Sequence, residues 1–240
     1  MFRTLRKLFR PSRRIPGKVV AKTPRVVILA SGHQQRWIVS SKETIHHKQL
    51  VLVEGEVLLQ RTLRQLSKRW ETRPLVVTHH PEIAKAIAKH ADVLELPPKK
   101  RRWISETALS SQSHWGDPTL ILSGDVYWTD DALDVACNFN IGGPIRYLLT
   151  EAAQGDDILG LWFRRRHRSR VATALNHAML HAKLGKSGKL WQSYRSLCGF
   201  SLVRHQLEAI HAVRIEDRST DFDTLGEYLA FVQQRSRRAA

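Results

Sequence analysis

Cysteine is scarce in this sequence: among 240 residues only Cys137 and Cys198 occur, and they match no paired metal-ligand spacing. Two isolated cysteines provide no disulfide framework, so the sequence predicts a protein of a reducing compartment, and we expect a cytoplasmic location. Long apolar runs are missing too, which argues against a bilayer-spanning helix. The basic amino-terminus lacks the apolar core that a secretory signal peptide requires.

Acidic residues are also in the minority. The chain has 39 Lys and Arg against 22 Asp and Glu, a formal net charge of +17. Residues 1–25 contain nine of the basic residues and no acid, so the remainder has 30 basic and 22 acidic residues, a net charge of +8. This remaining excess indicates an anionic ligand or surface without specifying which. The hydrophobic fraction of 42% is sufficient for a core and too high for a disordered chain.

The length predicts one domain, residues 25–240, preceded by a basic extension, residues 1–24. Four apolar residues between positions 2 and 9 fall near helical spacing with basic residues between them, and Pro11 ends the pattern. Residues 2–10 could therefore form a short helix that makes peripheral contact with an anionic membrane. A flexible basic tail is the alternative we favour, because one helix of this length is marginal in water.

Short apolar, β-rich runs alternate with helical patterns along the rest of the chain. This alternation predicts an α/β domain with a doubly wound, largely parallel sheet. The predicted strands are 26–30, 75–78, 93–96, 119–122, 145–149, 158–163 and 213–215, and the predicted helices are 57–66, 81–89, 105–111, 130–137, 169–184 and 225–234.

Two unusual segments follow predicted strands, and ligands of open α/β sheets bind beyond the carboxyl ends of the strands. The first is Ala30-Ser31-Gly32-His33-Gln34-Gln35-Arg36. Its backbone N–H groups could face phosphate oxygens, Gly32 permits close approach, and Arg36 can grip a phosphate in bidentate fashion. Alone, a glycine after a strand is usually an ordinary turn. The second is Ser123-Gly124-Asp125, whose acid suits Mg²⁺ shared with phosphate, or alternatively caps a turn.

Two further segments carry candidate chemistry. In Asp221-Phe222-Asp223-Thr224 the two acids point the same way on an extended segment and could share a cation. The alternative, which we favour for this segment in isolation, is that Asp223 caps the following helix. Lys48 follows the glycine loop and could neutralise phosphate charge, whereas the alternative is a surface lysine. Lys42 is a rival for that role.

Taken in order, these segments resemble the nucleotidyltransferase superfamily with the glycosyltransferase-A-like fold. Its members include molybdenum-cofactor nucleotidyltransferases, methylerythritol-phosphate cytidylyltransferase and sugar-phosphate nucleotidyltransferases. The resemblance covers residues 25–137 and 213–232, and residues 138–212 match no member. It rests on Leu29-Ala30-Ser31-Gly32 with Arg36, on Lys48-Gln49-Leu50, on the run from Gly55 to Leu63, on Gly124-Asp125 and on Asp221-Phe222-Asp223-Thr224.

The resemblance implies a three-layer α/β/α, Rossmann-like fold with a mostly parallel mixed sheet, of the nucleotide-diphospho-sugar transferase type. It implies an enzyme that depends on Mg²⁺ and transfers NMP from an NTP to a phosphorylated or otherwise anionic small acceptor, releasing pyrophosphate. Arg36 and Lys48 would be catalytic, and Asp125 and Asp223 would hold the Mg²⁺. The nucleotide would contact Leu29, Ala30, Ser31, Gly32, His33, Gln34, Gln35, Ser105, Glu106, Thr107, Ser123 and Gly124.

The chain departs from the family pattern at two places. His33-Gln34-Gln35 stands where many members have a second small residue, and the usual proline-acid pair after Thr224 is absent. Outside the pattern, Arg164, Arg165 and Arg166 could bind the anionic acceptor, although a solvated loop is the alternative we favour. Nucleic acid is not an expected partner, because the sequence shows neither basic-aromatic interleaving nor a helix-turn-helix pattern.

Two other functions stay open at this stage. One is a glycosyltransferase that uses a nucleotide-sugar on the same fold. The glycine loop and Lys48 argue against it, since those residues suit a triphosphate. The other is a non-catalytic basic module that docks on a membrane or nucleic acid and retains a degenerate nucleotide pocket. Pyrophosphate release would separate the first possibility from nucleotidyl transfer.

Overall fold

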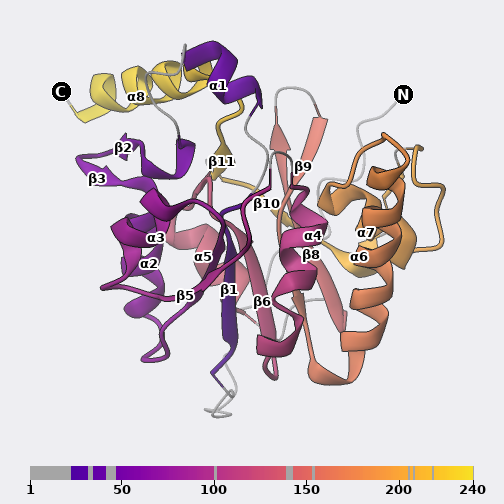
Figure 1. Cartoon of the computed structure of the whole chain (residues 1–240). Coiled ribbons are helices and arrows are strands. Elements are labelled where there is room, and N and C mark those ends of the chain that lie inside the picture. Colours follow the sequence, from indigo (N-terminus) through magenta and orange to yellow (C-terminus); the bar gives the residue numbers. More distant parts are fainter. Residues whose placement is uncertain are drawn as a thin grey trace, which may run out of the picture.

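A seven-stranded sheet lies at the centre of the computed structural model, with helices on both of its faces (Figure 1). The predicted leader lies outside the described residues except for its last two positions, as do Gly32, His33, Gln34 and Lys42. The described residues are 23–31, 35–41, 47–99, 102–138, 143–152, 155–204, 206–207, 209–217 and 219–239.

The strand order in the sheet is β10-β8-β9-β6-β1-β4-β5. Strand β9 runs antiparallel to both of its neighbours, and the remaining pairs are parallel. The sheet is therefore mixed and mostly parallel, as predicted. Its strands are β1 (Arg25–Leu29), β4 (Leu75–Thr78), β5 (Asp92–Glu95), β6 (Thr119–Ser123), β8 (Ile145–Ala152), β9 (Gly155–Phe163) and β10 (Ala212–Ile215).

Short two-stranded ladders flank the sheet, and helices occupy the connections. The ladders are β2 (Leu52–Val53) with β3 (Glu56–Val57), and β7 (Val126–Tyr127) with β11 (Thr220–Asp221). The α-helices are α1 (Gln35–Ser41), α2 (Leu58–Ser67), α3 (Pro81–Ile87), α4 (Ile104–Ser110), α5 (Asp130–Cys137), α6 (Arg168–Lys183), α7 (Leu190–Leu197) and α8 (Leu225–Ala239). Short 3-10 helices are η1 (Lys48–Leu50), η2 (Gln112–His114), η3 (Arg165–His167) and η4 (Ala209–His211).

Alternate residues of the central strand β1 build the two faces of the core. Val26 and Ile28 pack with side chains of α2, α3 and α5 on one face. Val27 and Leu29 pack with side chains of α4, α6 and α7 on the other. Because a strand turns successive side chains to opposite faces, a wholly apolar strand needs cover on both. The resulting three layers match the predicted fold class.

A third apolar cluster covers the carboxyl edge of the sheet. Trp37 of α1, Tyr127 of β7 and Phe222 are buried there, with Tyr228 and Phe231 of α8 packed against them. Helices α1 and α8 lie side by side above this edge (Figure 1). The cluster therefore ties the last helix to the segment that begins after the first strand. Within the part of the chain described above, no helix has the length and apolar character needed to cross a bilayer.

The predicted strands and helices agree with the observed ones to within a few residues at most ends, but two helices were not predicted. Helix α1 begins at Gln35, so it includes only the last two residues of the segment interpreted as a phosphate loop, Gln35 and Arg36. Helix α7 lies in the region without family resemblance. Its buried residues Leu190, Tyr194 and Leu197 recur with helical spacing, so a periodic signal was present in the sequence.

Candidate active site

Strands β1 and β6 end side by side, and Gly124 makes this possible. Its N–H donates to the carbonyl of Leu29 over 2.9 Å. A Cβ at Gly124 would lie 3.0 Å from that oxygen, so a side chain here would crowd backbone. The glycine therefore allows Asp125 to follow β6 at the place where the chain leaves β1. This is the carboxyl edge of the sheet, where ligands of open α/β folds bind.

Lys48 brings the first half of the site together. Its Nζ lies 2.6 Å from Oδ2 of Asp125 and 3.7 Å from Oδ1 of Asp223, and its side chain is 8% exposed. Burial alone would lower the pKa of Lys48, but the carboxylates of Asp125, Asp221 and Asp223 outweigh burial and raise that pKa above its ordinary value. Lys48 is therefore a buried cation within an acidic cluster, and the surface-lysine alternative is wrong.

The ladder of β11 with β7 places the second acidic segment beside the first. Asp221 pairs with Val126, the residue after Asp125. Asp221 and Asp223 both line the pocket, whereas Phe222 between them is buried in the third apolar cluster. The prediction that the two acids face the same way is confirmed. Burial raises the pKa of Asp221 from 3.8 to about 7, with Lys48 opposing this effect.

Thr224, and not Asp223, caps helix α8. The Thr224 hydroxyl accepts from the N–H of Glu227, and Oε2 of Glu227 accepts from the N–H groups of Asp223 and Thr224. This reciprocal arrangement is a capping box. The interpretation of Asp223 as the cap is wrong, because the following threonine takes that role and leaves the Asp223 carboxylate to the pocket. The usual proline-acid pair is absent after Thr224, and the hydrogen bonds to Glu227 hold Asp223 and Thr224 in place instead.

Arg36 also reaches this cluster. Its NH1 lies 2.9 Å from Oδ2 of Asp223, and its side chain is 65% exposed. The structure thus brings together four predicted residues from four separate segments, Arg36, Lys48, Asp125 and Asp223. Two cations and two anions satisfy one another here, and a bound ligand would have to exchange these ion pairs for its own.

A group of histidines lies beside the start of the glycine loop. Ser31 is buried, and its hydroxyl is 2.8 Å from Nδ1 of His79. The His80 ring stacks between those of His79 and His47, with centroids 3.8 and 4.4 Å apart. Burial lowers the pKa of His79, and it lowers that of His80 to about 4. The rings of His79 and His80 are therefore neutral at pH 7. The rest of the predicted loop, Gly32 to Gln34, lies outside the described residues.

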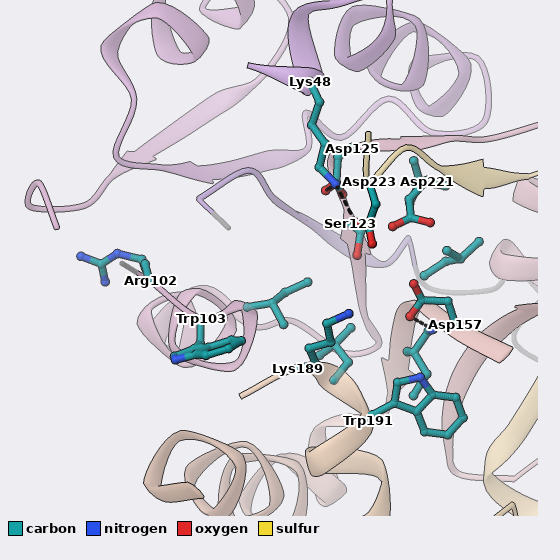
Figure 2. A pocket seen from close by; sticks show the side chains of 15 residues that line it. Lys48, Arg102, Trp103, Ser123, Asp125, Asp157, Lys189, Trp191, Asp221 and Asp223 are labelled. Atoms are coloured by element: carbon teal, nitrogen blue, oxygen red, sulfur yellow. Dashed lines mark hydrogen bonds and ion pairs between the residues drawn. The ribbon is translucent and has the colours of Figure 1, made fainter. Parts of the chain in front are cut away.

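The acidic cluster forms one wall of a pocket with a volume of about 160 Å³ (Figure 2). The opposite wall comes from three other places in the chain, the start of α4, the start of β9 and the start of α7. Sequence reasoning missed the contribution of β9 and α7, because no motif marks them. The residues of this second wall include Trp103, Asp157, Lys189 and Trp191, all labelled in Figure 2.

The segment expected around the base and ribose lies in α4, but its side chains point elsewhere. Ser105 is buried and donates to the carbonyl of Gly188 over 2.8 Å. Thr107 is buried and donates to the carbonyl of Trp103. Glu106 pairs with Lys99 and Arg102. The preceding residues Arg102, Trp103 and Ile104 line the pocket instead. A role of residues 105–107 in nucleotide binding stays a prediction.

The arginines predicted to bind the acceptor lie at the opposite edge of the sheet. They follow β9, and β9 runs antiparallel to β6, so Phe163 pairs with Thr119 at the amino end of β6. The N–H of Arg165 donates to Oδ1 of Asp117, which precedes β6. Because the pocket opens at the carboxyl end of β6, these three arginines do not line it. The position of Arg164, Arg165 and Arg166 favours the solvated-loop alternative.

The donor set at the pocket suits Mg²⁺, which prefers oxygen ligands and is usually held by one or two carboxylates together with substrate phosphates. Asp125 and Asp223 supply two carboxylates on one wall. Among the described residues, no group of three or more His, Cys, Asp or Glu is arranged to hold a metal ion by itself. A site completed by phosphate oxygens does not need such a group, so the residues fit a metal that arrives with its nucleotide.

Solved structures resemble this chain over most of its length. A nucleotidyl transferase from Methanothermobacter thermautotroptrophicus is 18% identical with a TM-score of 0.62, covering 89% of this chain and 98% of that one. The CTP:phosphocholine cytidylyltransferase of Streptococcus pneumoniae is 10% identical with a TM-score of 0.60, covering 87% and 97%. The inositol-1-phosphate CTP transferase of T. maritima is 11% identical with a TM-score of 0.59, covering 85% and 91%.

No family model and no curated protein sequence matches the chain. At these low identities the structural likeness shows the fold alone. The chain therefore has the α/β fold of these nucleotidyltransferases, and the predicted fold class is confirmed. What it does with that fold must be argued from its own residues.

Proposed function

We propose that this protein is a Mg²⁺-dependent nucleotidyltransferase that transfers NMP from an NTP to a phosphorylated or otherwise anionic small acceptor. The observation that carries the proposal is the convergence of Lys48, Asp125 and Asp223 in one pocket at the carboxyl edge of the sheet. Lysine is almost never buried unless it is paired, and here three carboxylates surround it. The solved structures of the same fold that carry the names of nucleotidyltransferases support the same activity.

In this reaction an acceptor oxygen attacks the α-phosphorus in line, a new P–O bond forms, and the bond to the pyrophosphate oxygen breaks. Asp125 and Asp223 would hold Mg²⁺, which supplies charge neutralisation at the phosphates when bound. Lys48 would exchange its ion pairs for phosphate oxygens and stabilise the charge that develops during transfer. Arg36, exposed beside Asp223, would contact the triphosphate from outside. Such chemistry depends on positioning and charge, and it requires no covalent nucleophile.

The ion pairs within the site explain how the cluster tolerates its own charge. Lys48 is buried, and an uncompensated ammonium would be costly at that position. Asp125 provides the compensation at 2.6 Å. With a metal-nucleotide complex bound, Asp125 and Asp223 would pair with the metal ion, and Lys48 and Arg36 would pair with phosphate oxygens. Every group that loses an ion pair would therefore gain a new partner of opposite charge to its own.

The test is a pyrophosphate-release assay with each of the four NTPs, Mg²⁺ and a panel of phosphorylated acceptors, preceded by a thermal-shift screen with NTP and Mg²⁺. A ligand that binds only the folded state raises the melting temperature by mass action. We expect one NTP to stabilise the protein and pyrophosphate to appear with an acceptor. If no NTP binds with or without metal, the proposal fails. A nucleotide-sugar-dependent glycosyltransferase would release a nucleoside diphosphate instead.

A further inference from the structure

The pocket has a second polar wall that the proposed reaction has not yet used. It comes from β9, α7 and α4, and it faces the acidic cluster of Lys48 across the pocket (Figure 2). Its two charged groups that face the acidic cluster are the carboxylate of Asp157 and the ammonium of Lys189, with Trp103 and Trp191 beside them (Figure 2). These residues belong to the middle of the chain, where no motif predicts a function.

Asp157 is a partly buried carboxylate at the start of β9. Its Oδ1 accepts from the N–H of Ile158 over 2.8 Å. Burial raises the pKa of Asp157, and the positive charge of Lys189 acts against this effect. A carboxylate that is removed from water in this way is stabilised by any hydrogen-bond donor that a ligand presents to it.

Lys189 is an exposed residue directly before α7, and its side chain extends into the pocket (Figure 2). The backbone just before it is fixed to α4. Ser105 donates to the carbonyl of Gly188 through both its N–H and its hydroxyl, over 3.3 and 2.8 Å. A Cβ at Gly188 would lie 2.9 Å from Cγ of Trp103. This contact, which admits only glycine, gives the base of the lysine a fixed position.

The pocket volume limits what the second wall can bind. A cavity of about 150 Å³ holds a body the size of benzene, and the pocket here measures about 160 Å³. A nucleotide and an acceptor cannot both lie wholly within this volume. If the phosphates lie at Lys48 and Asp125, the nucleoside must extend outside this volume, and the remaining space suits one small polar molecule.

We propose that Lys189 and Asp157 form the acceptor subsite and determine acceptor specificity. The ammonium of Lys189 pairs with the phosphate of a small phosphomonoester, and the Asp157 carboxylate accepts hydrogen bonds from hydroxyl or ammonium groups on its body. Trp103 and Trp191 limit the size of that body. This inference rests on the proposed function, and it assigns the role first considered for Arg164, Arg165 and Arg166 to a different pair of residues.

The test compares KM and kcat for wild type, Lys189→Ala and Asp157→Asn, with glucose 1-phosphate, glycerol 3-phosphate and phosphoethanolamine as acceptors. We expect both variants to raise the acceptor KM about tenfold or more, the loss of one charge-assisted contact, while NTP binding with Mg²⁺ stays near wild type. Lys186→Ala, in the same loop but outside the pocket, is the matched control and should leave KM unchanged.

The Asp157→Asn variant distinguishes acceptors that carry hydroxyl groups from acceptors that carry an ammonium group. An amide still accepts a hydrogen bond from a hydroxyl, but it has no charge to pair with an ammonium. The KM for phosphoethanolamine should therefore rise more than the KM for the two hydroxylated acceptors. An unchanged acceptor KM in both variants would overturn the assignment, and so would a wild type that uses none of the three phosphomonoesters although it binds NTP. If the wild type binds no NTP at all, the failure lies in the proposed function itself.

Discussion

The Nζ of Lys48 lies 2.6 Å from Oδ2 of Asp125, although 76 residues lie between the two in the sequence.

 This contact joins the segment after the glycine loop to the end of β6, and Asp223 completes it from the far end of the chain. Three distant segments therefore share one charge balance. Changing any one of these charges should alter both metal binding and stability, which makes the cluster accessible to simple experiments.

Asp125→Asn tests the metal role directly. The amide keeps the shape of the side chain but removes the charge that pairs with Lys48 and that would hold Mg²⁺. We expect pyrophosphate release to fall by at least about 100-fold, the scale on which loss of one charge-stabilising group acts. Circular dichroism should show an intact fold. Asp131→Asn, an exposed acid on α5, is the control and should retain activity. Full activity of Asp125→Asn would contradict the proposed function.

Lys48→Met tests whether metal and lysine compensate the same acids. The change keeps the apolar stem and removes the ammonium, leaving Asp125 and Asp223 without their buried cation. We expect a loss of about 1–3 kcal/mol in the free energy of unfolding, typical of a buried polar group that loses its partner. Added Mg²⁺ should then raise the melting temperature of the variant more than that of wild type. Lys68→Met, on the surface, should behave as wild type, and equal Mg²⁺ shifts in all three proteins would refute the idea.

Thr224→Ala tests the capping box that positions Asp223. The variant removes the hydroxyl that accepts from the N–H of Glu227. Loss of an N-cap of this kind costs about 1 kcal/mol, to be measured by urea denaturation. Because Asp223 is held by the same box, the Mg²⁺ concentration needed for half-maximal activity should rise as well. Thr224→Ser keeps the hydroxyl and should restore both properties, whereas loss of both in the serine variant would argue against capping.

The histidine group predicts a pH dependence of stability. Burial lowers the pKa of His80 in the folded protein from 6.5 to about 4, with His79 and His47 acting in the same direction and Glu82 against it. The unfolded chain therefore binds more protons between these values. The stability contributed by neutral His80 is complete above pH 6.5 and is lost as the pH falls towards 4. In His80→Phe, which keeps a stacked ring without a titrating group, unfolding free energy should fall less steeply across this window. Identical slopes in both proteins would contradict the prediction.

The sequence alone was enough for the layers of the fold and for one wall of the pocket. Short, continuous, β-rich apolar runs such as residues 26–30 are typical of buried parallel strands. Because ligands of open α/β sheets bind beyond the carboxyl ends of the strands, Asp125 was predicted to lie near the segment that follows the first strand. The second wall could not be predicted in this way. Asp157 reaches the same edge only because β9 is antiparallel, so it enters the pocket from the start of its strand. Strand direction is a property of pairing, which no local pattern in this region reveals.

The same limit applies to Lys189, which depends on contacts between separate helices. Its position follows from Gly188 packing against Trp103, two residues with no relation in the sequence. Asp223 is the opposite case. The local sequence indicates a helix cap here, but the cap was assigned to Asp223 and not to Thr224. Thr224 and Glu227 have the spacing of a capping box, so the sequence contained the signal that releases Asp223 from capping.

Gly124→Ala tests the close approach on which the whole site depends. A Cβ at this position would lie 3.0 Å from the Leu29 carbonyl and 3.1 Å from Cγ2 of Ile28, inside the tightly packed contact between β1 and β6. Overpacking of this kind typically costs about 1–3 kcal/mol, which urea denaturation can measure. The strand ends should also separate slightly, so Asp125 should move relative to Lys48 and activity should fall even at temperatures where the variant is folded. Gly185→Ala, at an open loop position with φ of +78°, provides a contrast, since it should lower stability through backbone strain without affecting turnover of the folded protein. Equal activity per folded molecule in Gly124→Ala and wild type would show that the site tolerates a wider gap between these strands than the geometry implies.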